Sequence, residues 1–190
     1  MAEPGAPEAV KYFVAVLWTT ADALTDARNL LQGEFGTIDF QGPDRAFDRS
    51  DYYESEMGPN LQRRLIAFAE LRGPDELAQA KRRCIVIEAK LASPHGRRVN
   101  LDVGYLDHNK IVLASVKAAG QKIYLCDGIY ADLVARYADG RYQPFPWTFP
   151  DFKDGRYDAE LGELRQMYLR QIKDWRMQMH HEGHEGHEGH

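Results

Sequence analysis

One stretch in the middle of the sequence, RRVNLDVGYLDHNKIVLASVK, alternates polar with apolar residues. This alternation predicts two strands joined as a β-hairpin, with residues 108–109 as the two-residue loop. In that register Asp102 lies opposite Ser115 and Asn100 lies opposite Lys117, on the face away from the apolar side chains. Since directly opposed residues have Cβ atoms about 4.5–5.5 Å apart, a carboxylate, an amide and an ammonium group should converge there.

A cluster of this kind could bind, or act on, a small phosphorylated or nucleotide-like ligand. Asp102 and Glu56 would serve as acid–base groups or metal ligands, while Lys117 with Arg97 or Arg98 would neutralise negative charge. We therefore name Asp102, Lys117 and Glu56 as candidate catalytic residues. The alternative interpretation is a solvated sheet face that carries an ordinary cross-strand pair.

Two other segments carry polar and aromatic side chains that could form a second wall. DYYESEMG offers Tyr52 and Tyr53 beside a Gly-Pro turn, and PWTFPDF offers Trp147 and Asp151 between prolines that hold the backbone extended. Both segments could instead be loops packed over the end of a sheet. The candidate ligand-binding residues are Asn100, Tyr105, Arg97, Arg98, Tyr52, Tyr53, Trp147 and Asp151. The same aromatic surface would also suit a non-catalytic binding module for a nucleic-acid or protein partner.

Composition narrows the class of protein. The 190 residues are 44% hydrophobic and 28% charged, as in ordinary globular domains. The formal charge of −5 disfavours general nucleic-acid binding, which needs a basic face. The N-terminus lacks a signal pattern, and no apolar run approaches the ~20 residues of a membrane span, so we expect a cytoplasmic protein without membrane contact. Cys84 and Cys126 lie in apolar runs and are expected to be buried free thiols.

The order of the expected elements indicates an α+β fold. VKYFVAVLW reads as a buried strand, TTADALTDARNLLQGEFG as a helix, TIDF and LQRRLIAFAEL as strands, and the segment from Pro74 as a second helix. The last part of that helix, CIVIEAKLA, could instead be a strand. We predict a ferredoxin-like β-α-β-β-α-β start, extended by antiparallel strands and a C-terminal amphipathic helix. The expected organisation is a flexible arm (1–9), one α+β domain (10–179) and a disordered His-rich tail (180–190).

The C-terminus, MHHEGHEGHEGH, holds five of the seven histidines of the chain. Imidazoles at this spacing on a flexible segment can bind a divalent metal such as Ni²⁺, Zn²⁺ or Cu²⁺. The candidate metal ligands are His181, His184, His187 and His190. The alternative is a solubilising tail or an affinity tag without a role for metal. Because only two histidines precede it, neither a Ser-His-Asp nor a Cys-His arrangement is readable, and covalent hydrolase chemistry is disfavoured.

Several motifs in order resemble a bacterial family, the domain of unknown function family 4416. They are DYYESEMG (51–58), RRVNLDVGYL (97–106), IVLASVK (111–117), IYLCDGIYADL (123–133) and PWTFPDF (146–152), so the resemblance covers nearly the whole chain apart from its tails. It implies that Asp102, Tyr105, Lys117 and Trp147 belong to a shared motif, but it supplies no reaction. The family pattern has proline in place of Val103 and tyrosine in place of Phe149 and Phe152. No GxxxxGK[ST] phosphate loop occurs in the chain.

Overall fold

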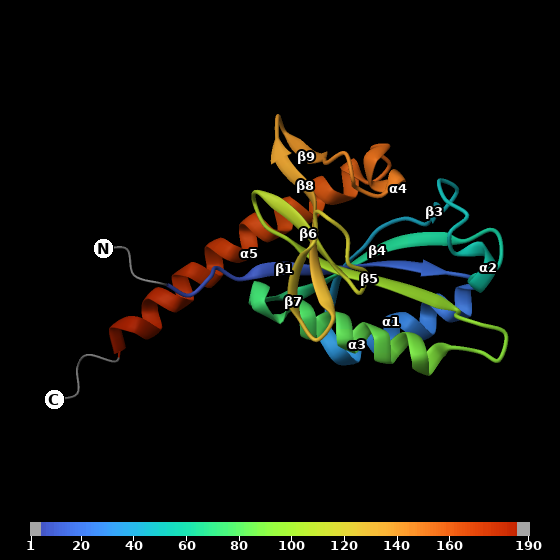
Figure 1. Cartoon of the computed structure of the whole chain (residues 1–190). Helices are drawn as coiled ribbons and strands as arrows, with labels where there is room; N and C mark the ends of the chain where they lie inside the picture. Colours follow the sequence, from blue (N-terminus) through green and yellow to red (C-terminus); the bar gives the residue numbers. More distant parts are fainter. Residues whose placement is uncertain (1–4, 186–190) are drawn as a thin grey trace.

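The computed structural model describes residues 5–185, with side chains up to residue 178. Within this range the chain forms one antiparallel sheet of nine strands flanked by helices (Figure 1). The elements are β1 (Val10–Trp18), α1 (Ala21–Phe35), β2 (Ile38–Gln41), β3 (Arg45–Ala46), α2 (Glu54–Met57), β4 (Gln62–Arg72), the 3₁₀ turn η1 (Pro74–Glu76), α3 (Leu77–Leu91), β5 (Val99–Leu106), β6 (Lys110–Ser115), β7 (Ile123–Cys126), β8 (Ile129–Ala138), β9 (Arg141–Pro144), α4 (Pro150–Lys153) and α5 (Asp158–Glu185).

The strand order is β2-β4-β1-β5-β6-β8-β7, with β3 attached to β4 and β9 attached to β8. The predicted α+β class with an antiparallel sheet and a C-terminal helix is therefore confirmed. The first part of the chain runs β1-α1-β2-β4-α3-β5, with β3 and α2 inserted between β2 and β4. Neighbouring strands in the order β2-β4-β1-β5 are all antiparallel.

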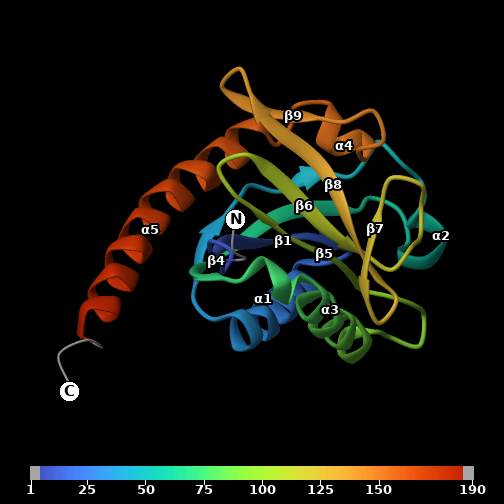
Figure 2. The ribbon, with the colours of Figure 1, turned by 60° about the vertical axis from the view of Figure 1, so that its left-hand side comes forward.

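Two layers of helix cover the two faces of the sheet (Figures 1 and 2). Helices α1 and α3 bury their apolar stripes on one face, where Leu31, Phe35, Cys84 and Ile87 pack with alternate residues of β1 and β5. The opposite face packs against α5. Because side chains alternate along a strand, even-numbered and odd-numbered residues of β5 belong to different faces. Asn100 and Asp102 therefore share the α5 side.

Helix α1 shows how local sequence signals set the element boundaries. The Thr20 hydroxyl accepts a hydrogen bond from the amide of Ala23 at 3.3 Å, which satisfies one of the unpaired donors of the first turn. Gly36 ends the helix with φ of 89°, a conformation that a glycine adopts without steric cost. The sequence allows Thr19 or Thr20 as the cap and Gly33 or Gly36 as the end, and the structure selects Thr20 and Gly36.

The β5–β6 hairpin has the predicted register where its strands pair. Tyr105 lies opposite Val112, and Gly104 lies opposite Leu113. Two-residue hairpin loops usually have positive φ angles, but neither residue 108 nor residue 109 is among those with positive φ. Instead, Asp107 Oδ1 accepts hydrogen bonds from the amides of Asn109 and Lys110, at 2.7 and 2.8 Å. A side chain therefore fixes the turn.

CIVIEAKLA is helical and belongs to α3, as the helix prediction had it, and the strand alternative is excluded because its buried residues recur at helical spacing. Other segments differ from the sequence predictions. QKIYLCDGIYADLVARYA is divided into β7 and β8 by a turn at Asp127-Gly128, where both residues have positive φ. PFPWTFPDF is extended only in part, because Pro150 begins the short helix α4. Cys84 is buried as predicted, but Cys126 is exposed because β7 forms an outer edge of the sheet.

The structure also describes residues near both ends of the predicted domain. Of the predicted arm, Ala9 is buried and its carbonyl accepts a hydrogen bond from the Tyr168 hydroxyl at 3.2 Å. Helix α5 extends to Glu185, whereas the sequence predicted that the helix would end near residue 179. Each further helical residue adds one hydrogen bond, and this gain competes with the cost of about 1 kcal/mol for a glycine. In the described part of the chain, no helix has the length and apolar character to cross a membrane.

Candidate functional site

A cavity of about 520 Å³ lies beside β5 and β6. Its walls come from β5, β6, α3, the segment between β3 and α2, and the start of α4. The lining residues are Phe47, Arg49, Ser50, Tyr52, Tyr53, Arg63, Lys81, Ile85, Glu88, Arg97, Asn100, Asp102, Leu113, Ala114, Ser115, Val116, Lys117, Lys122, Asp132, Phe149, Pro150 and Asp151. Six of these side chains are basic and four are acidic, in a chain whose formal charge is −5.

The cavity exists because β5 and β6 separate after a short paired segment. They are paired only from Leu106 to Gly104, so the predicted pairs of Asp102 with Ser115 and of Asn100 with Lys117 are not formed. Helix α3 supplies the missing partners for Leu101. Lys81 Nζ donates to the Leu101 carbonyl at 2.8 Å, and Glu88 Oε1 accepts from the Leu101 amide at 2.6 Å. These two side chains satisfy backbone groups that would otherwise be unpaired in the interior.

Arg63 on β4 organises the wall on the β5 side. Its guanidinium donates to Asp151 Oδ2 at 2.5 Å and to Asp102 Oδ2 at 3.1 Å, and it lies over the ring of Phe47. Burial alone lowers the pKa of Arg63, but the charges of Asp151 and Asp102 outweigh that effect and the pKa is raised. The second oxygen of Asp102 lies 4.0 Å from Lys81 Nζ. Both oxygens of Asp102 therefore face cations.

Arg97 links the outer part of the same wall to α2. It forms a two-pronged ion pair with Glu56, with distances of 2.9 Å to each carboxylate oxygen. It also donates to Asn100 Oδ1 at 2.8 Å, and it lies 3.6 Å from Glu88 Oε2. Burial lowers the pKa of Arg97, but the hydrogen bond to Glu56 and the charge of Glu88 leave it raised. The Asn100 Nδ2 group is buried and has no hydrogen-bond partner among the described residues.

The opposite wall combines groups from β6, from β8 and from the loop before β7. Lys122 Nζ donates to Ser115 Oγ at 2.8 Å and lies 3.4 Å from Asp132 Oδ2. Asp132 is 4% exposed, and its Oδ1 atom lacks a hydrogen-bond partner in the described part of the chain. This wall thus holds a buried ion pair with one unused acceptor.

Lys117 and Tyr52 lie at the mouth of the cavity. Both are exposed, and the Lys117 ammonium donates to the Tyr52 hydroxyl while lying 3.9 Å from the ring centroid. Phe149, also exposed, lines the cavity from the start of α4. The contact between Lys117 and Tyr52 is partly open to water, so a ligand could replace it at low cost.

Glu88, on the α3 side of the cavity, has a pKa raised above its ordinary value. Burial raises its pKa, while Lys81, the Leu101 amide and Arg97 act against that effect. The neighbouring Tyr53 phenol also has a raised pKa, because of burial and the charge of Asp102. The Glu88 carboxyl group can therefore stay protonated at a pH above its ordinary pKa.

The structure brings most of the predicted site residues to this cavity. Those that line it are Asp102, Lys117, Asn100, Arg97, Tyr52, Tyr53 and Asp151. Glu56 does not line it but holds Arg97. Three others lie elsewhere. Tyr105 packs against Tyr12 on the α1–α3 side, Arg98 reaches Asp26 at 3.5 Å, and the Trp147 indole donates to the Leu133 carbonyl at 2.8 Å while stacking on Phe145.

The sequence did not point to six charged residues of the cavity, namely Arg49, Arg63, Lys81, Glu88, Lys122 and Asp132. A signal was present for two of them. Lys81 and Glu88 are seven residues apart in KRRCIVIE and share the buried face of α3 with Cys84 and Ile87. Charged residues on an apolar helix face are rarely buried without partners, so they mark an internal polar site. The other four carry no comparable signal, because Arg49 and Lys122 lie outside the strands and nothing in the sequence of β4 or β8 marks Arg63 or Asp132 as a buried charge.

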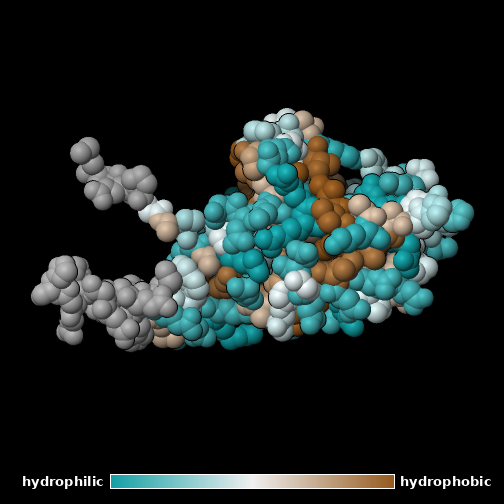
Figure 3. All heavy atoms as spheres, turned by 90° about the horizontal axis from the view of Figure 1, so that it is seen from below, coloured by the Kyte–Doolittle hydropathy of each residue, from teal (hydrophilic) through white to brown (hydrophobic). Residues whose placement is uncertain are grey.

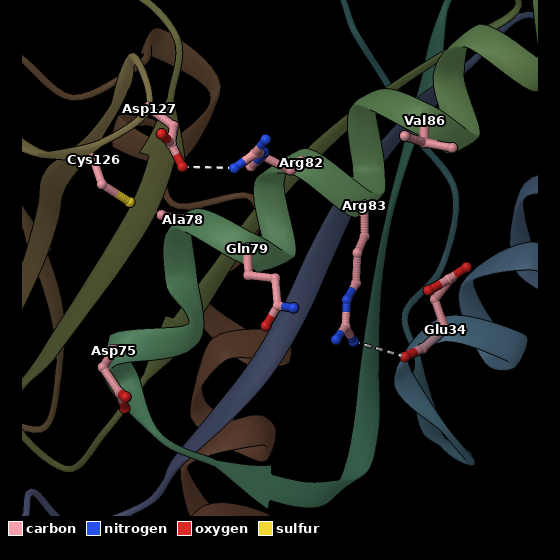
Figure 4. A pocket seen from close by; sticks show the side chains of 9 residues that line it. All are labelled: Glu34, Asp75, Ala78, Gln79, Arg82, Arg83, Val86, Cys126 and Asp127. Carbon is pink, nitrogen blue, oxygen red and sulfur yellow. Dashed lines mark hydrogen bonds and ion pairs between the residues drawn. The ribbon is translucent and has the colours of Figure 1, made fainter.

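A second, shallower cavity of about 440 Å³ lies between the end of α1, α3 and the β7–β8 turn (Figure 4). Arg82 forms an ion pair with Asp127 at 2.6 Å, and Arg83 donates to the Glu34 carbonyl at 3.3 Å. Arg82 and Asp127 are both more than half exposed. Since it has no buried polar group without a partner, this cavity is the weaker candidate for a specific ligand.

No group of three or more metal-ligating side chains gathers in the described residues. The predicted metal ligands His181 and His184 lie in the last turns of α5, where only the backbone is described, and His187 and His190 lie outside the described residues. The metal-binding tail therefore stays a prediction from the sequence.

The side of the molecule that carries α1 and α3 is mostly hydrophilic, and an apolar band crosses it (Figure 3). Exposed apolar side chains in the described residues include Val86 on α3 and Ile123, Tyr124 and Leu125 on β7. They lie on the helix layer and at the sheet edge, not in the cavity beside β5.

Comparison with known proteins gives a family and no activity. No curated protein and no solved structure matches the chain. One family model, described as "Domain of unknown function (DUF4416)", matches residues 8–168, which include every strand of the sheet and the whole lining of the cavity. The chain therefore belongs to the DUF4416 family of domains of unknown function.

Proposed function

We propose that the cavity beside β5 and β6 binds a small anionic molecule of the phosphorylated or nucleotide-like class. The observation that carries the proposal is the parting of β5 from β6, because α3 uses two buried charged side chains to replace the lost strand pairing. Keeping such groups buried is costly unless they are paired. A fold that keeps a gap of this kind open has room for a ligand there.

The distribution of charge supports an anionic ligand. Basic side chains outnumber acidic ones in the lining, and Lys117 and Arg97 hold their partners near the mouth. Arg97 presents a planar fork of donors, which suits phosphate and carboxylate oxygens. The size of the cavity falls in the range of about 300–1,000 Å³ typical of small-molecule pockets.

Binding fits the geometry better than acid–base catalysis by Asp102. Its two oxygens face Arg63 and Lys81, so the carboxylate is already engaged in holding the wall. A base must reach the proton it removes, and these contacts leave Asp102 little freedom to do so. Glu88, with its raised pKa, is the better-placed proton donor or acceptor if the bound molecule reacts.

The exposed rings of Tyr52 and Phe149 at the mouth favour a second candidate, a binding module for a nucleic-acid or protein partner. Such a partner would stack on these rings and need not enter the cavity. Fluorescence of Trp147, which stacks on Phe145 nearby in the chain, would report on contact at this edge. A partner of this kind should bind equally well when Asn100 is replaced by alanine.

We also infer that the first half of the chain is a ferredoxin-like unit. The support is the strand order β2-β4-β1-β5 with antiparallel neighbours, and the packing of α1 and α3 on one face. In this view β6 to β9 extend the sheet beyond β5. The cavity then lies at the junction between the unit and its extension.

A thermal-shift screen of the full chain tests the binding proposal. Inorganic phosphate, pyrophosphate, nucleotides and sugar phosphates are added to the wild-type protein and to Lys117→Ala. A ligand of the native state must raise the melting temperature by mass action, and at 100 times its Kd it adds about 2.7 kcal/mol. We expect a shift in the wild type and a smaller one in Lys117→Ala.

Lys173→Ala is the matched control, because Lys173 is an exposed lysine on α5 far in sequence from the cavity. It should leave the ligand-induced shift unchanged. Equal loss in both variants would mean that the shift comes from unspecific charge effects. No shift with any anion of the panel would contradict the proposal.

A further inference from the structure

We propose that the ligand is a phosphorylated polyhydroxy compound, with its phosphate at the mouth between Lys117 and Arg97 and its hydroxyl groups between Asn100 and Asp132. This inference rests on the proposed function and names the class of ligand. Its basis is a pair of buried polar atoms without partners, one on each wall of the cavity.

The first atom is the amide nitrogen of Asn100. Asn100 is 4% exposed, and its Oδ1 atom is occupied by the hydrogen bond from Arg97. That bond fixes the orientation of the amide, because only an oxygen can accept from the guanidinium. Nδ2 is therefore a donor, and it lacks an acceptor among the described residues.

The second atom is Oδ1 of Asp132, on the opposite wall. Asp132 is 4% exposed, and the other oxygen of its carboxylate lies 3.4 Å from the Lys122 ammonium. Oδ1 is an acceptor with no donor in the described part of the chain. A buried polar atom left unpaired costs about 1–3 kcal/mol, so both positions favour a ligand that completes them.

One chemical group satisfies both atoms. A hydroxyl donates one hydrogen bond and accepts others, so neighbouring hydroxyls can accept from Asn100 and donate to Asp132. A fully ionised phosphate cannot donate to Asp132, and its charge would be repelled by that carboxylate. The phosphate therefore belongs with the cations near the mouth, and the hydroxylated carbon skeleton belongs at the buried end.

Lys117 and Arg97, the cations at the mouth, are suited to binding the phosphate group. Lys117 contacts Tyr52, and Arg97 contacts Glu56, so both cations touch one short segment that covers the cavity. These contacts are partly exposed and can be exchanged for a phosphate group. The cavity of about 520 Å³ is large enough for a pentose or hexose phosphate and far larger than a phosphate ion needs.

Calorimetric titration of the full chain tests the inference with three probes: inorganic phosphate, ribose 5-phosphate and phosphoethanolamine. Ribose 5-phosphate should bind about tenfold tighter than the other two, as expected for two added hydrogen bonds in a buried site. Phosphoethanolamine carries a phosphate and a donor but no hydroxyl, so it separates hydroxyl recognition from simple pairing with Asp132.

The decisive variant is Asp132→Asn, with Asp139→Asn in the exposed β8–β9 turn as its control. Asp132→Asn keeps the shape of the side chain and removes one negative charge. Ribose 5-phosphate should bind about tenfold more weakly, whereas inorganic phosphate should bind equally or more tightly because a repulsive carboxylate is gone. A general loss of structure would weaken the binding of both compounds, so it cannot produce these opposite changes in affinity.

Asn100→Ala tests the inference independently if Asp132→Asn fails to fold. It too should weaken ribose 5-phosphate more than inorganic phosphate. Equal affinity for all three probes, or for ribose 5-phosphate and phosphoethanolamine, would overturn the hydroxyl assignment while leaving the anion site standing. Failure of every probe to bind the wild type would overturn both the site and its assignment.

Discussion

Arg63 shows how one buried side chain can join three parts of the chain. It lies on β4, donates to Asp102 on β5 and to Asp151 on α4, and is 3% exposed. Its charge is compensated by two carboxylates, which makes a buried guanidinium tolerable. The wall of the cavity therefore depends on the same contacts that hold α4 against the sheet.

From the sequence alone, Asp102→Asn would be expected to remove function and leave stability unchanged. The ion pair with Arg63 leads to another expectation. The substitution should lower the free energy of unfolding by about 1–3 kcal/mol, because it removes one charged partner of a buried cation. Urea unfolding measures the loss. Asp44→Asn, which affects the more exposed pair with Arg64, should change stability by about 0.5 kcal/mol or less.

Glu88 should make stability depend on pH. Burial raises its pKa in the folded protein above the unfolded value of about 4.3. The folded state then favours the protonated form, so the contribution of Glu88 is fully present below pH 4.3 and declines as pH rises through the raised pKa. Glu88→Gln removes this titration and retains an acceptor for Leu101.

The stability of Glu88→Gln relative to wild type should therefore increase as pH rises above about 4.3 and then level off. Unfolding curves at a series of pH values test this directly. A difference between the two proteins that does not vary with pH would mean that the pKa of Glu88 is not raised.

At the scale of elements, Gly104 marks the point where β5 and β6 separate. It lies opposite Leu113, and a Cβ atom at this position would come within 2.3 Å of the Val112 carbonyl oxygen and 2.6 Å of a Leu113 methyl. The two strands approach so closely here that only glycine fits. Beyond this point they diverge, and Lys81 and Glu88 bind the Leu101 backbone and line the resulting cavity.

Gly104→Ala should destabilise the protein by about 1–3 kcal/mol, because the added methyl group forces the strands apart. Gly33→Ala is the matched control. Gly33 lies in α1 with open space around it, so alanine should stabilise by about 0.5–1 kcal/mol. Thermal unfolding measures the expected loss of stability in Gly104→Ala and the expected gain in Gly33→Ala. A neutral result for Gly104→Ala would contradict the close approach of the strands.

The sequence was most informative where a signal is local. The apolar run VKYFVAVLW defined β1, Thr20 and Gly36 bounded α1, and alternation predicted the register of the β5–β6 hairpin. The separation of β5 from β6 was not predictable in the same way. It depends on α3 side chains reaching Leu101 across the sheet, and such tertiary contacts leave no periodic pattern in the strand itself.

The whole molecule concentrates basic groups in a cavity although the chain is acidic. The net charge of −5 disfavours a nucleic-acid surface, whereas a cavity with more basic than acidic side chains can still attract a small anion. Helix α5 covers the opposite face of the sheet, where Gln171 Oε1 accepts from the buried Lys11 ammonium at 3.0 Å. Beyond this contact, Ile172 and Trp175 still pack against the core.

Deletion of residues 180–190 should remove divalent-metal binding and leave the melting temperature of the metal-free protein unchanged. The deleted segment holds five of the seven histidines, and Gln171 and Ile172 of α5 are retained. Titration with Ni²⁺, with EDTA as the control for reversibility, measures the first effect. Metal binding that survives the deletion would place the site in the folded domain.

Chemical-shift mapping of the ¹⁵N-labelled full chain during titration with ribose 5-phosphate tests whether the ligand binds between β5 and β6. The largest shifts should fall on the amides of residues 97–104 and 113–117 and on Lys122 and Asp132. Shifts centred on Arg82, Arg83 and Asp127 would instead place the ligand in the cavity between α1, α3 and the β7–β8 turn and contradict a site between β5 and β6.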